Sequence, residues 1–184
     1  MRESIGMVEL SSIGIGYDVE DAMLKAAAVE LIVARTICSG KYIVIIAGDV
    51  GAVESSVRAG LDTAGDAVID HLVIPNVHPS IFNAIPGTVT IAPEDRKALG
   101  IIETFSATSI IECADVAAKA AEVKLFRVHL SMAIGGKGFL LLSGEVGAVR
   151  AAIEAGVVPA ARRGLLASKI VIPSPREELF SEYI

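Results

Sequence analysis

A seven-residue stretch that occurs twice constrains the fold of this chain more than any other feature. Residues 47–53 read AGDVGAV and residues 143–149 read SGEVGAV, so five of the seven positions are identical and the acid is kept. The similarity extends outward at an offset of 94 residues. Matched pairs at that offset are Gly6/Gly100, Glu9/Glu103, Asp21/Asp115, Lys25/Lys119, Ala26/Ala120, Ala27/Ala121, Val29/Val123 and Leu31/Leu125. Self-similarity of this length indicates a tandem duplication of one folding unit.

The second copy is longer than the first at two places. The offset rises to 96 by Gly40/Gly136 and to 98 by Val73/Val171, and each rise is a two-residue insertion in the second copy. The first insertion lies after residue 31 and before residue 40 of the first copy. Insertions are tolerated best at exposed loop tips. We therefore expect the two copies to differ at one loop, and this loop is the candidate place for function.

The duplication divides the 184 residues into two small domains. We expect a first domain over residues 1–81, a linker over 82–97 that contains two prolines, and a second domain over 98–184. Hydrophobic residues make up 53% of the chain and the mean hydropathy is +0.61, yet aromatic residues are only 4%. Domains of this size bury a limited share of their surface. The surplus of small aliphatic residues therefore favours oligomerisation.

Charge and hydropathy argue against several classes of function. The net charge is -6 with no basic run, whereas nucleic-acid affinity depends on phosphate neutralisation, so we expect no nucleic-acid partner. No apolar run approaches the roughly 20 residues of a membrane helix, and we expect no membrane partner. The start of the chain has no apolar signal region, which favours a cytoplasmic location. Two cysteines do not form a disulfide framework.

Periodicity predicts the same order of elements in both copies. β-branched and alternating runs predict strands, and a 3.6-residue apolar period predicts helices. The expected order is strand, helix, strand, strand, helix, strand, which is the split βαβ of a ferredoxin-like α+β domain. The expected strands are 5–10, 30–36, 41–47 and 71–74, then 99–104, 124–130, 138–142 and 169–172. The first expected helix begins after an N-cap at Asp18. The other expected helices run from 50 to about 67, from 112 to 121 and from 146 to about 161, and residues 176–184 are expected to form a short helix or a frayed end.

Several paired motifs resemble those of a known family. The stretches IGMVEL, DAMLKAA, TICSGKY, AGDVGAV and VIPNVHPS are similar to the bacterial microcompartment (BMC) shell-domain family over residues 4–180. The two copies resemble its tandem-domain (BMC-T) branch, most of all the shell proteins of propanediol-utilising compartments. This resemblance implies a homotrimer that forms a flat pseudohexameric tile, with the hairpin loops around a central pore. It also implies assembly with other shell proteins into a microcompartment shell around enzymes.

Cys38 is the candidate cofactor ligand. It lies in the sequence TICSGK, at the expected tip of the first hairpin. A lone loop cysteine is more often an incidental small residue than a metal ligand. The resemblance, however, implies that three Cys38 thiolates meet on the three-fold axis and hold a 4Fe-4S cluster in the pore, for electron transfer or cluster delivery across the shell, with encapsulated redox enzymes as possible partners. Ser39 stands where this family has proline. The other cysteine, Cys113, falls on a buried helix stripe, and we expect it in the core.

The resemblance also assigns residues to the pore and to the edge of the tile. The expected pore-loop residues are Ile37, Ser39, Gly40, Met132, Gly135 and Gly136. The second loop, residues 131–138, lacks the full spacing of a phosphate loop and is interpreted as a flexible turn that lines the pore. The expected tile-edge residues are Lys25, Lys119, Asn76 and Ser174, the last two at positions where the family commonly has arginine.

Three other functions remain open from the residues alone. The pore could conduct metabolites without any cofactor. Tandem ferredoxin-like units also serve as small-ligand sensors, because fold does not fix function. An enzyme that uses Cys38 as a nucleophile is the least favoured, since none of the three histidines lies where it would match and an exposed hairpin tip does not exclude water. We identify no catalytic residues, because no nucleophile and base pair recurs in the two copies.

Overall fold

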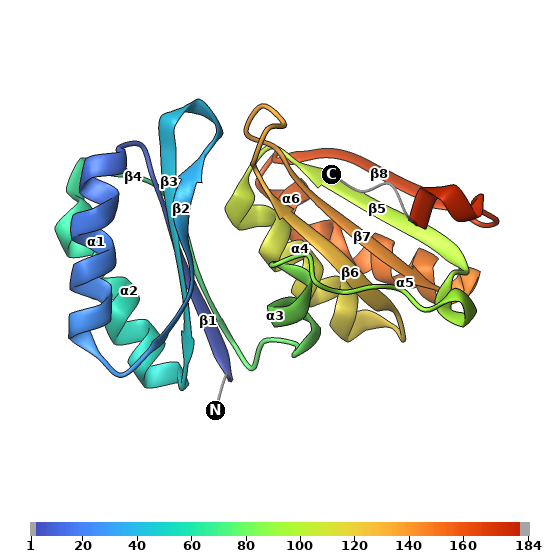
Figure 1. Ribbon diagram of the computed structural model, residues 1–184, viewed down its shortest axis with the longest axis horizontal. Helices are drawn as coiled ribbons and strands as arrows, with labels where there is room; N and C mark the ends of the chain where they lie inside the picture. Colours follow the sequence, from blue (N-terminus) through green and yellow to red (C-terminus); the bar gives the residue numbers. More distant parts are fainter. Residues whose placement is uncertain (1–2, 181–184) are drawn as a thin grey trace. The chain divides into compact units, whose positions relative to one another are not determined.

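The computed structural model describes residues 3–180, which fall into two compact units. Unit 1 contains residues 3–77 together with the short segment 132–136, and unit 2 contains residues 78–131 and 137–180. Each unit has a four-stranded antiparallel sheet with its long helices on one face (Figure 1). Within the described residues, no helix has the length and apolar character needed to cross a bilayer.

Unit 1 follows the expected order of elements. Its sheet order is β2-β3-β1-β4, which with two helical crossovers is the ferredoxin-like topology. The elements are β1 Ser4–Leu10, α1 Ile13–Ala26, β2 Glu30–Ile37, η1 Cys38–Gly40, β3 Lys41–Gly48, α2 Val50–Ala64, η2 Gly65–Ala67 and β4 Val68–Pro75.

Unit 2 repeats this topology with the sheet order β6-β7-β5-β8. The elements are α3 Ser80–Ala84, η3 Pro93–Asp95, β5 Ala98–Thr104, α4 Ala107–Ala120, β6 Lys124–Leu130, β7 Gly138–Gly144, α5 Val146–Gly156, α6 Val158–Arg162, β8 Leu166–Ile172 and η4 Glu177–Phe180. The predicted α+β class with two ferredoxin-like units is therefore confirmed. The expected linker, residues 82–97, begins inside α3 and contains η3.

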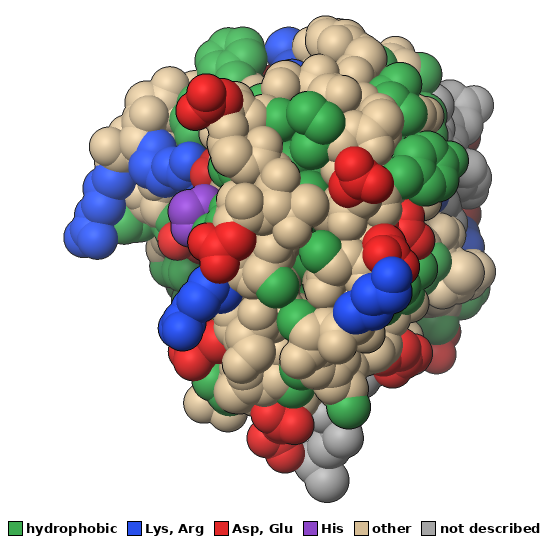
Figure 2. Space-filling view, turned by 90° about the vertical axis from the view of Figure 1, so that its left-hand side faces the viewer, with side chains coloured by type: hydrophobic (Ala, Val, Ile, Leu, Met, Phe, Trp, Pro, Cys, Tyr) green, Lys and Arg blue, Asp and Glu red, His purple; other side chains and the backbone are tan. Residues whose placement is uncertain are grey.

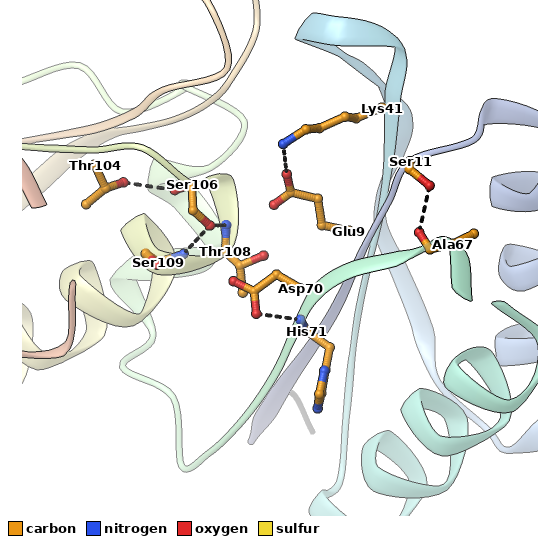
Figure 3. Close-up of polar contacts among 10 residues, drawn as sticks. All are labelled: Glu9, Ser11, Lys41, Ala67, Asp70, His71, Thr104, Ser106, Thr108 and Ser109. Carbon is orange, nitrogen blue, oxygen red and sulfur yellow. Dashed lines mark hydrogen bonds and ion pairs between the residues drawn. The ribbon is translucent and has the colours of Figure 1, made fainter. Parts of the chain in front are cut away.

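The first long helix of each unit starts earlier than the sequence indicated. Ser12 caps α1 by accepting the N–H of Ile15 at 3.4 Å, so the predicted cap at Asp18 is wrong. Ser106 caps α4 by accepting two backbone N–H groups at 3.2 Å, as Figure 3 shows, and α4 therefore begins five residues before Glu112. A serine hydroxyl satisfies the donors that a helix start leaves unpaired.

Three other predicted boundaries are also wrong. The last helix of the second copy was expected to reach about residue 161, but α5 ends at Gly156 and a separate short helix, α6, follows. Strands β4 and β8 begin at Val68 and Leu166, three residues before the predicted starts. At the C-terminus, residues 177–180 form a 3-10 turn, and the rest of the expected element lies outside the described residues.

The core of unit 1 lies between the sheet and its two helices. Its fully buried members come from β1, α1, β3 and α2 and include Val8, Leu10, Val19, Met23, Val44, Ile46 and Val53. The outer side of α1 and α2 carries acidic and basic side chains scattered among uncharged ones, with no continuous basic patch (Figure 2).

The two units fill one helix–strand contact in opposite ways. In unit 1, a side chain at Gly16 of α1 would come within 2.5 Å of the Tyr42 ring on β3. In unit 2 the sizes are exchanged, because a side chain at Gly138 of β7 would come within 2.6 Å of Ile110 on α4. Each unit therefore places one large residue opposite a glycine, which preserves close packing.

Candidate functional site

Cys38 lies at the tip of the β2–β3 hairpin, where the chain reverses tightly. The two residues after it, Ser39 and Gly40, adopt φ values of 66° and 70°. Ile37, just before the tip, is buried and anchors the end of β2, whereas Cys38 is partly exposed. Proline cannot adopt the φ of Ser39, because its ring fixes φ near −65°. Ser39 therefore occupies a turn conformation that proline excludes.

The segment 132–136 supplies the polar surroundings of the Cys38 thiol. The backbone N–H of Gly136 lowers the pKa of Cys38, burial opposes this effect, and the N–H groups of Ile134, Gly135 and Ala133 lower the pKa further. Positive φ values at Ala133, Gly135 and Gly136 accompany this arrangement. Successive N–H groups in such a turn form a concave nest that favours negative charge. The site therefore favours the thiolate, which is the nucleophilic and metal-binding form of cysteine.

Sequence reasoning located the thiol but missed this nest. The only sequence signal was the Gly135–Gly136 pair beside the two-residue insertion, which we interpreted as a flexible turn. Residues 132–136 form one contact unit with residues 3–77, although they lie in the second copy of the repeat. The sequence pattern does not show which distant residues a glycine loop will face.

An ion pair ties each hairpin to the first strand of its unit. Lys41, at the start of β3, donates to Glu9 of β1 at 2.8 Å, as Figure 3 shows. Lys137 donates to Glu103 at 2.8 Å, and this hydrogen bond lowers the pKa of Glu103 against the opposing effect of burial. Ser168 also donates to Glu103, at 3.0 Å. Both hairpin bases are thus fixed by the same paired charges, and their tips can differ.

The described residues of one chain do not form a complete metal site. No group of three or more His, Cys, Asp or Glu side chains in residues 3–180 is placed to hold a metal ion. Cys38 offers one sulfur ligand per chain. Cys113 is fully buried in α4, and burial raises its pKa to about 11, so the prediction of a core residue is confirmed. Buried cysteines of this kind are typically structural and unreactive.

The four expected edge residues lie on exposed or half-exposed surface. Lys25 and Lys119 are in the last turns of α1 and α4, where a cation suits the helix dipole. Each lysine pairs with the aspartate four residues earlier, at 2.5 Å for Lys25 and 2.6 Å for Lys119. Asn76, with a φ of 52°, and Ser174 are exposed after β4 and β8. Their role at a tile edge stays a prediction.

Two ferredoxin-like units in tandem, each with a four-stranded sheet and its helices on one face, define a two-domain α+β protein. The chain belongs to the BMC domain family, whose model matches residues 4–77 and 98–175. It is a structural shell protein of a bacterial microcompartment, and the resemblance seen in the sequence motifs is confirmed.

Known relatives agree over the full length of the chain. The bacterial microcompartment shell protein PduT of Citrobacter freundii is 42% identical over 184 residues, which is 100% of this chain and 99% of that protein. The crystal structure of a microcompartments protein from Desulfitobacterium hafniense DCB has a TM-score of 0.91 and 50% identity, and covers 97% of this chain and 98% of its own. A fused permuted hexameric shell protein from the RMM microcompartment has a TM-score of 0.65 and 25% identity, and covers 86% of this chain and 81% of its own. As a member of a shell-protein family, the chain assembles with other shell proteins.

Proposed function

We propose that three copies of the chain form a pseudohexameric tile with a central pore, and that Cys38 of each chain binds one 4Fe-4S cluster in that pore. Two shell domains per chain make six domains in three chains, and one structural relative is described as a fused hexameric shell protein. A closed three-fold ring brings equivalent atoms of three chains toward one axis. Symmetry would then supply the two thiolates that one chain lacks.

The observation that carries the proposal is the environment of Cys38. Iron–sulfur clusters are held mainly by cysteine thiolates, and hydrogen bonds to the sulfurs help to set their reduction potentials. The Cys38 thiol is partly exposed at a hairpin tip, and the N–H groups of residues 133–136 lower its pKa. The residues present therefore fit such a group, although three cysteines leave one iron for a ligand of another kind.

A cluster in this position supplies one-electron chemistry when it is bound. The tile would then pass electrons across the shell or deliver the cluster itself, with encapsulated redox enzymes as the partners on the inner side. The chain's own contribution is to lower the pKa of each Cys38 thiol, through the nest, and to fix the hairpin, through the Lys41–Glu9 pair.

The test is an anaerobic absorption spectrum with two matched cysteine variants. Wild-type protein purified without oxygen is expected to be brown, with a sulfur-to-iron charge-transfer band. Cys38→Ala should lose the band, and Cys113→Ala should keep it because that thiol is buried in α4. A colourless wild-type protein that also fails to take up iron and sulfide would contradict the proposed cluster. Sedimentation of the same samples measures the trimer separately.

A pore without cofactor is the second candidate, and the nest itself favours it. Backbone N–H groups that favour negative charge around Cys38 would also favour anionic metabolites. This version predicts a trimer that contains no iron and is unchanged by Cys38→Ala. The same spectra and iron analysis therefore separate the two functions. A small-ligand sensor has no such support, since the relatives named above are shell proteins.

A further inference from the structure

The end of the chain repeats the segment that follows the first unit. At the offset of 98, His78 matches Arg176, Ile81 matches Leu179 and Phe82 matches Phe180. The two segments begin with the same turn. The N–H of Ile81 donates to the carbonyl of His78 at 3.0 Å, and the N–H of Leu179 donates to that of Arg176 at 3.1 Å. We call residues 78–82 the linking segment and residues 176–180 the C-terminal segment.

The linking segment has a well-defined binding surface within unit 2. The N–H of His78 donates to Asp115 Oδ1 of α4 at 2.7 Å, while the other carboxylate oxygen of Asp115 accepts from Lys119. Helix α3, which starts in this segment, packs against α4 and β6. Ile81 is fully buried, and Leu125 of β6 is only 3% exposed. A buried carboxylate of α4 therefore receives the linking segment, and α3 covers β6, the strand in which Leu125 is buried.

The same receiving groups occur in unit 1, but there they are exposed. Helix α1 matches α4 residue by residue, with serine caps and both helix limits at the offset of 94. Asp21 stands at the place of Asp115 and likewise pairs with the lysine four residues later, yet its side chain is exposed. Leu31 stands at the place of Leu125 and is 38% exposed.

The C-terminal segment also exposes an apolar side chain to solvent. Leu179, the counterpart of the buried Ile81, is 44% exposed. Arg176, the counterpart of His78, is exposed, and its guanidinium pairs at the surface with Glu178 at 3.4 Å, which leaves the backbone N–H as the group that would reach a carboxylate. Phe180, by contrast, is buried against Phe126 of β6 in its own unit and anchors the segment. The N–H of Arg176 and the side chain of Leu179 therefore match the exposed groups of unit 1 in chemistry.

We propose that the C-terminal segment of one copy docks on α1 and β2 of a second copy, as the linking segment docks on α4 and β6 within one chain. The Arg176 N–H then donates to Asp21 of the second copy, and Leu179 covers its Leu31. This contact joins two different surfaces, so it is head-to-tail and closes a ring when the rotation allows. The inference rests on the proposed trimer, and it names the residues that make it.

Cross-linking tests the contact directly. In a Cys38→Ser, Cys113→Ala background, the pair Asp21→Cys and Arg176→Cys is treated with a short bismaleimide. Covalent bands of two and three chains are expected on a denaturing gel. The pair Glu154→Cys and Lys169→Cys is the geometric control, since those exposed side chains meet within one chain, and it should give an internal cross-link by peptide mass spectrometry. An internal link in the control without larger bands in the test pair would overturn the proposal.

A substitution at Leu179 measures the strength of the contact. Leu179→Asp should weaken trimer formation at least about tenfold by sedimentation, because charge is placed against apolar surface, while the far-ultraviolet circular dichroism stays that of the folded chain. Leu179→Met, which keeps the apolar volume, should leave the trimer intact. A Leu179→Asp trimer as strong as wild type overturns this contact alone. A wild-type protein that sediments as a monomer overturns the trimer itself.

Discussion

The two cysteines have opposite environments, and their reactivity should separate with pH. The nest of residues 133–136 lowers the pKa of Cys38, and burial raises that of Cys113 to about 11. In dilute folded protein, Cys38 should therefore be alkylated by iodoacetamide with a midpoint below the ordinary thiol value of about 8.5, and Cys113 should stay unmodified. Peptide mass spectrometry after timed labelling at several pH values measures both. In urea the two midpoints should coincide; a Cys38 midpoint that is the same in folded and unfolded protein would contradict the nest.

The two lysine–glutamate pairs at the hairpin bases should differ in their contribution to stability. Glu9 is only 1% exposed, so Lys41→Met removes the cation that donates to a buried carboxylate and should lower the free energy of unfolding by roughly 3 kcal/mol. The Lys137–Glu103 pair is more exposed, and in Lys137→Met the Glu103 carboxylate still accepts the hydrogen bond from Ser168. This variant should therefore lower the free energy of unfolding by about 1 kcal/mol or less. Urea unfolding at neutral pH measures both variants. Equal losses of unfolding free energy in the two variants would contradict the argument from the burial of Glu9.

At the scale of elements, the exchanged glycines predict a compensating pair of substitutions. Gly16→Ile alone drives a side chain into Tyr42 and should destabilise by about 1–3 kcal/mol. Gly16→Ile with Tyr42→Gly reproduces the arrangement of unit 2 and should recover part of that loss. Recovery is incomplete, because Tyr42 also donates to Glu20 at 2.9 Å. Urea unfolding of the two single variants and the double variant gives the coupling energy, expected to exceed about 1 kcal/mol; additive losses would contradict the packing argument.

The sequence predicted elements well where side-chain chemistry is local, and poorly where it is not. β-branched runs placed β2 and β3 within one residue, and the repeat itself gave the topology. The helix starts were missed because the apolar stripe around Val19 began after the true cap at Ser12, and the intervening Gly14 and Gly16 hid the first turn. Glycine is needed at position 16 because a side chain there would collide with the Tyr42 ring, and this tertiary contact is not visible in the local sequence. The position of Cys38 was predictable from the hairpin pattern, but the nest of residues 133–136 depends on a fold contact between distant parts of the chain.

At the scale of the whole molecule, the duplication gives one chain two versions of each surface. The hairpin tips differ, since one carries Cys38 and the other carries the glycine nest, so each tip can specialise. The receiving surfaces differ as well, because Leu125 is buried within the chain and Leu31 is not. A single-domain shell protein has only one version of each surface. A tandem chain can therefore use one surface internally and keep its counterpart for a second copy.

A substitution at Lys25, the exposed lysine in the last turn of α1, can distinguish assembly of the tile from assembly of tiles into a shell. Lys25 is 74% exposed and pairs with Asp21, which is also exposed, so Lys25→Ala should change the free energy of unfolding by no more than about 0.5 kcal/mol. If Lys25 lies at the tile edge, the variant should keep the trimer but lose the sheets or tubes that overexpressed tiles form, as judged by pelleting and electron microscopy. Lys169→Ala removes an equally charged side chain that pairs with Glu154 and should keep the sheets. Lys119 is less suitable, because it neutralises the buried Asp115 and its loss would also disturb the fold. Extended sheets in Lys25→Ala equal to those of wild type would remove this residue from the edge, and the edge contacts would then have to come from other residues.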